Sequence, residues 1–203
     1  MGAWMLQSTD LRETQLLKRG LRLEYATLAW NVVGVVALSI AALAARSVAL
    51  AGFGLDSLIE IFASVVVVWQ LKGVDPSRER RALRLIGAAF FALAMYVLAQ
   101  SGYVLLRQLH PHPSLGGIIW LAVTIVAMLA LAYGKRDTGA KLGSTVLSTE
   151  ARVTLIDALL AFVVLIGVAL NAGLGWWWAD PVSGLLIVYY GFREGKHAWN
   201  EGS

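Results

Sequence analysis

The chain has 203 residues, of which 58% are hydrophobic and 15% charged, with a formal net charge of +4 and no cysteine. This composition excludes an ordinary soluble domain, and the lack of cysteine excludes a disulfide framework and a thiolate metal site. The first 24 residues are charged and lack the apolar stretch of a secretory signal peptide, so they predict a cytoplasmic lead-in.

Six apolar blocks follow this lead-in. A bilayer core of about 30 Å needs about 20 apolar residues per helix. The blocks at 25–45, 47–71, 85–106, 115–133, 153–174 and 176–192 meet or approach that length. We therefore predict an all-α, polytopic membrane protein with six transmembrane helices. They span residues 25–193, between the lead-in (1–24) and a short cytoplasmic tail (194–203). The expected location is the inner cell membrane.

The basic residues alternate between the two sides of this arrangement. Fifteen of the 17 Lys and Arg residues lie in the lead-in, in or beside the loops after the second and fourth blocks, or in the tail. Lys135 is assigned to the second of these loops, and only Arg46 and Arg107 lie on the opposite side. Because loops rich in Lys and Arg stay in the cytoplasm, both termini are predicted to be cytoplasmic. The positive charge therefore does not indicate a nucleic-acid partner.

Proline and glycine predict helix breaks at 72–77 and 110–114. Ser148 or Thr149 is the expected N-cap of the fifth helix, which would put Glu150 in its first turn. The tryptophans at 176–178 are typical of anchors at the membrane interface.

Three carboxylates lie inside the apolar blocks: Asp56 and Glu60 in the second, and Asp157 in the fifth. An acid at the centre of a membrane helix costs roughly 2.5–3.5 kcal/mol on insertion scales, and we expect no Lys or Arg at similar depth. Asp56 and Glu60 are four residues apart on one helix face, and Asp157 can meet them near the midplane. Converging carboxylates favour a divalent cation, and without one the site should hold at least one proton. Exchange of a metal for protons follows.

Other polar residues have two interpretations each. Asn31 could offer its amide oxygen to the metal or make an interhelical hydrogen bond. Glu150 could lead cations inward or complement the helix dipole, and Glu24 is expected at the interface. His110 and His112 fit either a solvated turn or a metal exit site.

Two stretches resemble known sequence patterns. The segment from Ser47 to Ser64, which contains Asp56-Ser57-Leu58-Ile59-Glu60, resembles the second helix of the cation diffusion facilitator family. The stretch from Ala179-Asp180-Pro181 to Arg193-Glu194-Gly195 resembles the sixth helix of that family, and Asp157 matches the Asp of its fifth-helix motif.

The resemblance implies a secondary transporter that exports a divalent metal from the cytoplasm, driven by proton influx, through a homodimer. Its transport site would be Asp56, Glu60 and Asp157, with Asn31 as a further candidate ligand. Zinc is the first expectation for the cargo, and iron or manganese stay open. The metal is then a substrate, so no resident cofactor is expected, and the chain is not expected to be an enzyme.

Two departures from the family pattern matter. Val153 stands where the family has the fifth-helix His, so one metal ligand is missing. The family's C-terminal cytoplasmic metal-binding domain is also expected to be absent.

Two other functions are open: a proton-coupled exporter of organic cations and a non-transporting membrane scaffold. Protection of the carboxylates by metal against carboxylate-reactive reagents would separate the first from metal export. Full function after neutralisation of all three acids would favour the scaffold.

The predicted topology can be tested by labelling, because the chain has no native cysteine. A cysteine introduced as Ser77→Cys should be inaccessible from outside intact cells, since it lies in a predicted cytoplasmic loop. Labelling by a membrane-impermeant thiol reagent added outside would overturn the topology.

Overall fold

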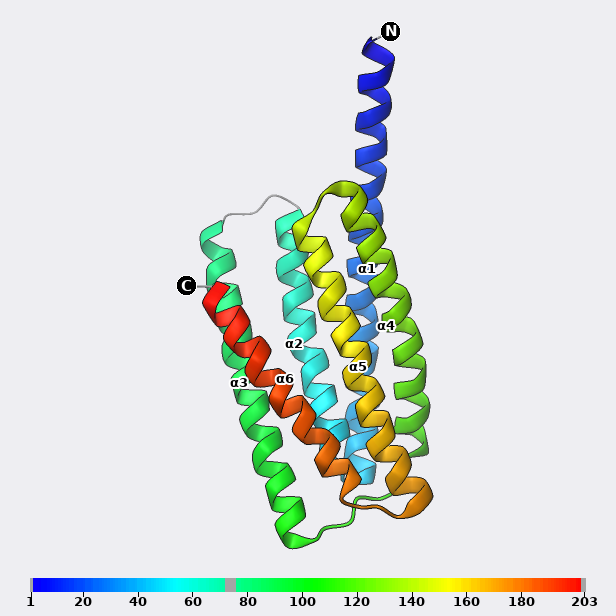
Figure 1. The fold of residues 1–203 in the computed structure, drawn as a ribbon, viewed down its shortest axis with the longest axis vertical. Helices are drawn as coiled ribbons and strands as arrows, with labels where there is room; N and C mark the ends of the chain where they lie inside the picture. Colours follow the sequence, from blue (N-terminus) through cyan, green and yellow to red (C-terminus); the bar gives the residue numbers. More distant parts are fainter. Residues whose placement is uncertain (1, 72–75, 202–203) are drawn as a thin grey trace.

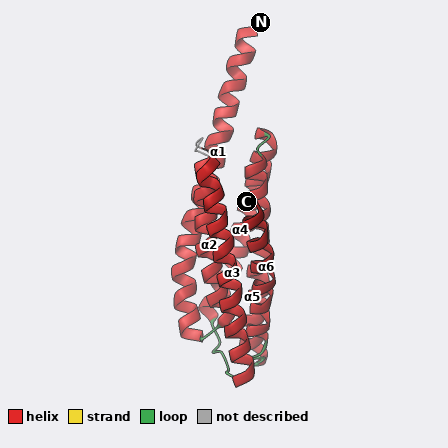
Figure 2. Ribbon diagram, turned by 90° about the vertical axis from the view of Figure 1, so that its left-hand side faces the viewer, coloured by secondary structure: helices red, strands yellow, loops and turns green. Residues whose placement is uncertain are grey.

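A computed structural model describes residues 2–71 and 76–201, which form six α-helices and no strand (Figures 1 and 2). The all-α prediction is therefore confirmed. In chain order the helices are α1 (Gly2–Ala45), α2 (Val48–Leu71), α3 (Pro76–Arg107), α4 (Leu115–Leu142), α5 (Thr145–Leu174) and α6 (Ala179–Glu201).

Four helical segments in the described part of the chain are long and apolar enough to cross a membrane: Thr14–Ala45, Arg84–Arg107, Leu115–Leu142 and Leu147–Leu174. They lie in α1, α3, α4 and α5. That all six helices cross, with both termini in the cytoplasm, stays a prediction. The boundaries at residues 24 and 193 fall inside α1 and α6, each of which is continuous there.

The helices form one elongated bundle with α2 at its centre. The helix α2 contacts α1, α3, α5 and α6, while α3 packs along α6 and α4 packs along α5. With 44 residues, α1 is about 66 Å long at 1.5 Å per residue, more than twice the thickness of a bilayer core of about 30 Å. Its N-terminal part extends beyond the other helices, at the end where α4 turns into α5 (Figure 1).

Burial in this bundle is the reverse of that in a soluble protein. Large apolar side chains point outward, among them Leu43 at 81% and Leu106 at 86% exposure. Acids, amides and hydroxyls are buried instead. Polar groups inside and apolar groups outside fit a bundle surrounded by lipid, where a polar side chain on the outer face would lack partners.

The connection between α4 and α5 corrects the predicted start of the fifth helix. Gly143 adopts the left-handed conformation (φ 63°) that commonly ends a helix. The side chain of Ser144, directly after it, accepts a hydrogen bond from the backbone N–H of Leu147 (3.3 Å). Ser144 is thus the N-cap, the prediction of Ser148 or Thr149 is wrong, and Glu150 does not lie in the first turn.

Of the two predicted helix breaks, one lies wholly within the described residues and the other only in part. The break at 110–114 is confirmed, since α3 ends at Arg107 and α4 begins at Leu115. Of the break at 72–77, residues 72–75 lie outside the described residues, and α3 begins at Pro76, a favoured first position of a helix.

A carboxylate of α6 holds the beginning of α2. Asp180 accepts hydrogen bonds from the Ser47 hydroxyl and from the backbone N–H groups of Val48 (3.1 Å) and Ala49 (3.4 Å). Ser47 in turn accepts from the N–H of Leu50 (3.1 Å). Helix N-termini leave such donors without intrahelical partners, so this contact fixes α6 against α2 at one end of the bundle.

Glycines let α6 approach its neighbours closely. A methyl group at Gly167 of α5 would lie 2.7 Å from Ser183 Cβ and 2.8 Å from the backbone oxygen of Ala179. A methyl group at Gly87 of α3 would lie 2.9 Å from the backbone oxygen of Gly195. Small residues at these points allow helix backbones to pack directly, as is common in membrane bundles.

Gly167→Ala should therefore destabilise the protein, because the backbone of α6 would have to move; overpacking of this kind typically costs about 1–3 kcal/mol. The matched control is Gly102→Ala, since a methyl group there meets nothing within 4 Å. The control should be neutral or slightly stabilising, because alanine favours helix over glycine by up to about 1 kcal/mol. Melting midpoints in detergent compare the two variants, and equal midpoints would show that α5 and α6 are not in close contact at Gly167.

Candidate functional site

The predicted site residues are all buried in the bundle. Asp56 and Glu60 of α2 are 1% and 7% exposed, Asp157 of α5 is 2% exposed, and Asn31 of α1 is 2% exposed. The Asn31 amide donates a hydrogen bond to Glu60 Oε2 (3.0 Å), so the interhelical bond expected for Asn31 is present. This bond uses the amide nitrogen and leaves the amide oxygen chemically available.

The three carboxylates influence one another through space. Glu60 interacts electrostatically with Asp157 and Asp56, and Asp157 interacts with Asp56. One oxygen of Asp56 and one of Asp157 are buried and make no hydrogen bond within the described residues. Buried carboxylate oxygens are normally hydrogen-bonded, so these two are suited to an additional cationic or protonated partner.

The present arrangement does not bring three ligands to one point. Within the described part of the chain, no three His, Asp or Glu side chains are placed to hold a single metal ion. Binding by Asp56, Glu60 and Asp157 together would thus require a change of side-chain rotamer or a small shift of α5 against α2.

Helix α6 adds two groups to this region that the sequence interpretation did not single out as site residues. Tyr190, 6% exposed, packs edge-to-face on Phe90 with ring centroids 6.1 Å apart. It lies within electrostatic range of the three carboxylates and of Glu194. Glu194 follows Tyr190 by four residues on the same face, interacts electrostatically with Asp56, and has a side chain only 14% exposed.

The residue in place of the family histidine faces α6. Val153 is half-buried and lines a hollow between α5 and α6, together with Glu194 and His197. The Glu194 carboxylate of α6 therefore lines the same hollow as Val153, the position at which the resemblance predicts a histidine.

A second buried charged cluster lies between α1, α4 and α5. The Lys135 ammonium donates to Glu24 Oε2 (3.1 Å), Glu150 Oε1 (3.4 Å) and Thr154 Oγ1 (3.1 Å). The side chains of Lys135 and Glu24 are fully buried, and that of Glu150 is 9% exposed.

This cluster corrects one expectation and bears on two others. Lys135 is not in a loop, because α4 continues to Leu142 and carries it on its buried face. Glu24, expected at the interface, is fully buried in the bundle, because Lys135 supplies a partner there; its depth in the membrane stays a prediction. No Lys or Arg was expected at the depth of the three acids; Lys135 is close enough to Asp157 to interact with it electrostatically, and the depth of both residues in a membrane stays a prediction.

The α3–α4 connection holds both predicted histidines. His110 and His112 are exposed; the ring of His110 stacks on Trp177 with centroids 5.1 Å apart. The backbone N–H of His112 donates to the Ala45 carbonyl (2.7 Å). These contacts describe an ordered turn, and the proposed exit site stays a prediction. Trp176 and Trp178, each 44% exposed, stack on each other beside it.

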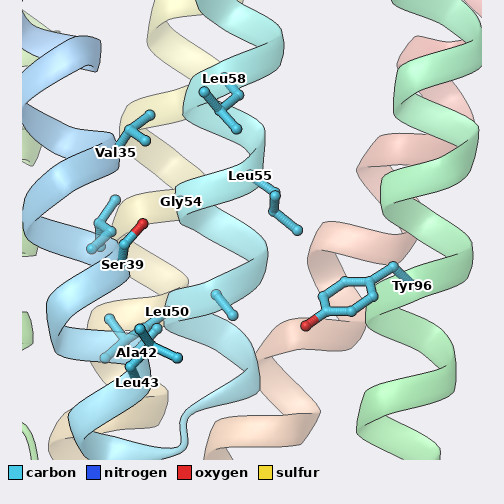
Figure 3. A pocket seen from close by; sticks show the side chains of 11 residues that line it. Val35, Ser39, Ala42, Leu43, Leu50, Gly54, Leu55, Leu58 and Tyr96 are labelled. Atoms are coloured by element: carbon cyan, nitrogen blue, oxygen red, sulfur yellow. The ribbon is translucent and has the colours of Figure 1, made fainter.

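A groove between α1 and α2 is a separate feature. Apolar side chains such as Val35, Leu50 and Leu58 line it, and Tyr96 of α3 lies across from it (Figure 3). None of the three acids lines this groove. Its chemistry suits an acyl chain or an apolar side chain and not a cation.

Comparison with known families identifies the domain formed by the later helices. The model of the cation efflux transmembrane domain matches residues 84–198, from α3 to near the end of α6. The chain belongs to the cation efflux family. The match includes Asp157, Val153 and Lys135, whereas Asp56 and Glu60 precede it. No curated protein matches the chain significantly.

Membership of this family makes the chain a multi-pass membrane protein of a class that transports cations. Helical periodicity could have located Lys135, because it lies fourteen residues, or about four turns, after the buried Leu121 and seven after the buried Met128. Asp180 was noticed only as part of the stretch that resembles the sixth helix, and no sequence signal indicated its partners at the start of α2, which are more than 130 residues away.

Proposed function

We propose that this cation efflux protein exports a divalent metal from the cytoplasm in exchange for protons. The observation that carries the proposal is the burial of Asp56, Glu60 and Asp157 on two adjacent helices, close enough for the three carboxylates to interact electrostatically. Carboxylate oxygens are the ligands of hard divalent ions. Three negative charges in a lipid-surrounded bundle require a cationic partner or protons, which is the basis for exchange of one for the other.

The ligand set argues for broad metal selectivity. Zinc prefers His and Cys ligands in tetrahedral sites, and Val153 removes the expected imidazole. Oxygen ligands alone suit manganese and ferrous iron, although the Irving–Williams order still favours zinc over manganese. We propose zinc as the first substrate, with iron and manganese carried as well. Glu194, across the hollow from Val153 and paired with Arg193 (3.9 Å), adds a carboxylate to the surroundings of the proposed site.

Family membership also motivates a homodimer in the inner cell membrane, with both termini in the cytoplasm. The exposed apolar faces of the bundle offer area for such an interface as well as for lipid. The mass of the protein in lipid nanodiscs checks this assembly, and a monomer there would count against it.

An exporter of organic cations is the second candidate, since the same acids can pair with an ammonium group. The hydrogen bonds between Lys135 and two glutamates show that this interior accommodates an ammonium. Treatment with a carboxylate-reactive reagent, with and without metal, separates the two functions. Only a metal exporter requires that the bound metal protect the carboxylates from the reagent.

The central test is metal-dependent proton flux in liposomes that contain the purified full-length protein. Zinc, iron and manganese are each added on one side, and internal pH and metal uptake are followed together. Uptake with opposite proton movement is expected. Metal transport without proton movement would exclude the exchange, and absence of metal flux for all three ions would exclude metal export.

The same assay tests whether the three acids act together. Asp157→Asn should reduce transport at least about tenfold, the size of effect typical even for outer partners of metal ligands. Adding Asp56→Asn should reduce it little further, because residues that share one ion are not additive. Asp137→Asn is the matched control: this carboxylate pairs with Arg19 and Lys141 at the exposed end of α4. Equal rates in Asp157→Asn and Asp137→Asn would refute the assignment.

Val153→His should raise the ratio of zinc to manganese transport, because an imidazole one turn before Asp157 favours zinc. The matched control is Leu155→His, whose side chain is 43% exposed on the outer face of α5. The control should leave the ratio unchanged. If both variants behave like the wild type under one imposed proton gradient, position 153 does not reach the transported ion.

A further inference from the structure

The Lys135 cluster is an oxygen cage around a positive charge. Three oxygens, Glu24 Oε2 from α1 and Glu150 Oε1 and Thr154 Oγ1 from α5, surround the Lys135 ammonium at 3.1–3.4 Å. Two carboxylates face one ammonium, so the cage carries excess negative charge. Glu24 Oε1 is buried as well and makes no hydrogen bond within the described residues. The cage therefore has more acceptor capacity than Lys135 uses.

Stability alone is a weak reason for such a cluster. Desolvation of buried charges often costs as much as their attraction returns, and apolar residues of similar volume frequently replace them without loss. The hydrogen bonds of the cage join α1, α4 and α5. The outer faces of α1 and α4 are largely apolar. The presence of Glu24, Lys135 and Glu150 in this position therefore favours a role for the negative potential of the two carboxylates.

The cage is connected to the three acids by two rows of polar side chains. On α1, Glu24 is followed by Thr27 and Asn31, all buried, and Asn31 bonds to Glu60. Both rows step through three or four residues and so stay on one helix face.

On α5, the row is Glu150, Thr154 and Asp157, again all buried. In both helices seven residues separate the cage from the acid site, a rise of about 10 Å. The cage lies toward the end where α4 turns into α5, which is the predicted cytoplasmic end (Figure 1).

We propose that Glu24, Glu150 and Thr154 form a second cation-binding site, for a divalent ion with oxygen ligands, that Lys135 occupies as a tethered competing cation. An ion arriving from the α4–α5 end displaces the ammonium, binds between the two carboxylates and passes along the polar rows to Asp157 and Glu60. Lysine suits this role because its compact charge sits on a flexible four-carbon stem that can move aside. The passage of the ion from this second site to Asp157 and Glu60 rests on the proposed function, whereas the second site itself is independent of it.

Equilibrium binding of Mn²⁺ to the purified full-length protein in lipid nanodiscs tests the proposal, with free Mn²⁺ measured by its EPR signal. At free Mn²⁺ concentrations too low to displace the ammonium, Lys135→Met should bind one more Mn²⁺ per chain than the wild type, because the competing charge is gone. Lys135→Arg keeps a tethered charge and should bind the same number as the wild type. The triple variant E24Q/K135M/E150Q should lose the additional ion. No gain in Lys135→Met would overturn the proposal and leave the cluster as a structural ion pair.

A second variant covers the case in which Lys135→Met does not fold, since removal of one partner of a buried pair is strongly destabilising. The double variant K135M/E24Q keeps the net charge of the wild-type cluster and should still gain one Mn²⁺, bound more weakly. Equal Mn²⁺ binding by this variant and the wild type would likewise overturn the proposal. Failure of the proposed function appears elsewhere, as unchanged Mn²⁺ binding and transport in D56N/D157N.

Discussion

The buried charges of this protein face the interior of the bundle because hydrocarbon offers neither water nor counterions to an ionised side chain. That constraint explains the position of α2, which carries Asp56 and Glu60 and contacts four other helices. It also explains why α1 and α5 place polar residues on one face and large apolar residues on the other. The buried charges thus favour one orientation of α1, α2, α4 and α5 about their axes, and glycines set how closely α6 packs on its neighbours.

Contacts far from the acids determine what surrounds them. Asp180 fixes the first turn of α6 on the start of α2, and Gly167 allows α6 to lie directly on α5. With this end held, the same face of α6 carries Tyr190 and, one turn later, Glu194 toward the acids of α2 and α5. A sequence feature that resembles a family motif, Asp180-Pro181, therefore acts at a distance from the ion, by aligning the helix that completes its surroundings.

Local patterns in the sequence were sufficient for the helix class, the break at 110–114 and the burial of the three acids. Each depends on composition or on spacing within one helix. The errors arose where two segments decide the outcome together. Lys135 and Glu24 were expected at the aqueous edges because each lies just outside an apolar block of the sequence; their pairing, across 111 residues, buries both in the bundle. The start of α5 was missed because Ser144 and Ser148 are equally good caps by residue type. Only the left-handed Gly143 distinguishes them.

The Lys135 ammonium and an ion at the acid site belong to one electrostatic system. With an effective dielectric of about 20, a single and a double positive charge about 10 Å apart repel by about 3 kcal/mol. Since 1.4 kcal/mol corresponds to a tenfold change in affinity, the ammonium in its cage, taken by itself, would weaken metal binding at the proposed Asp157 and Glu60 site by roughly a hundredfold. A carrier has to release its cargo, and a lysine that moves aside during loading and returns afterwards would lower affinity at the stage when release is needed. At the proposed site, the valine at position 153 would act in the same direction, because an all-oxygen site holds zinc less tightly than one with imidazole. The Lys135 ammonium and this valine would then both favour turnover over tight binding.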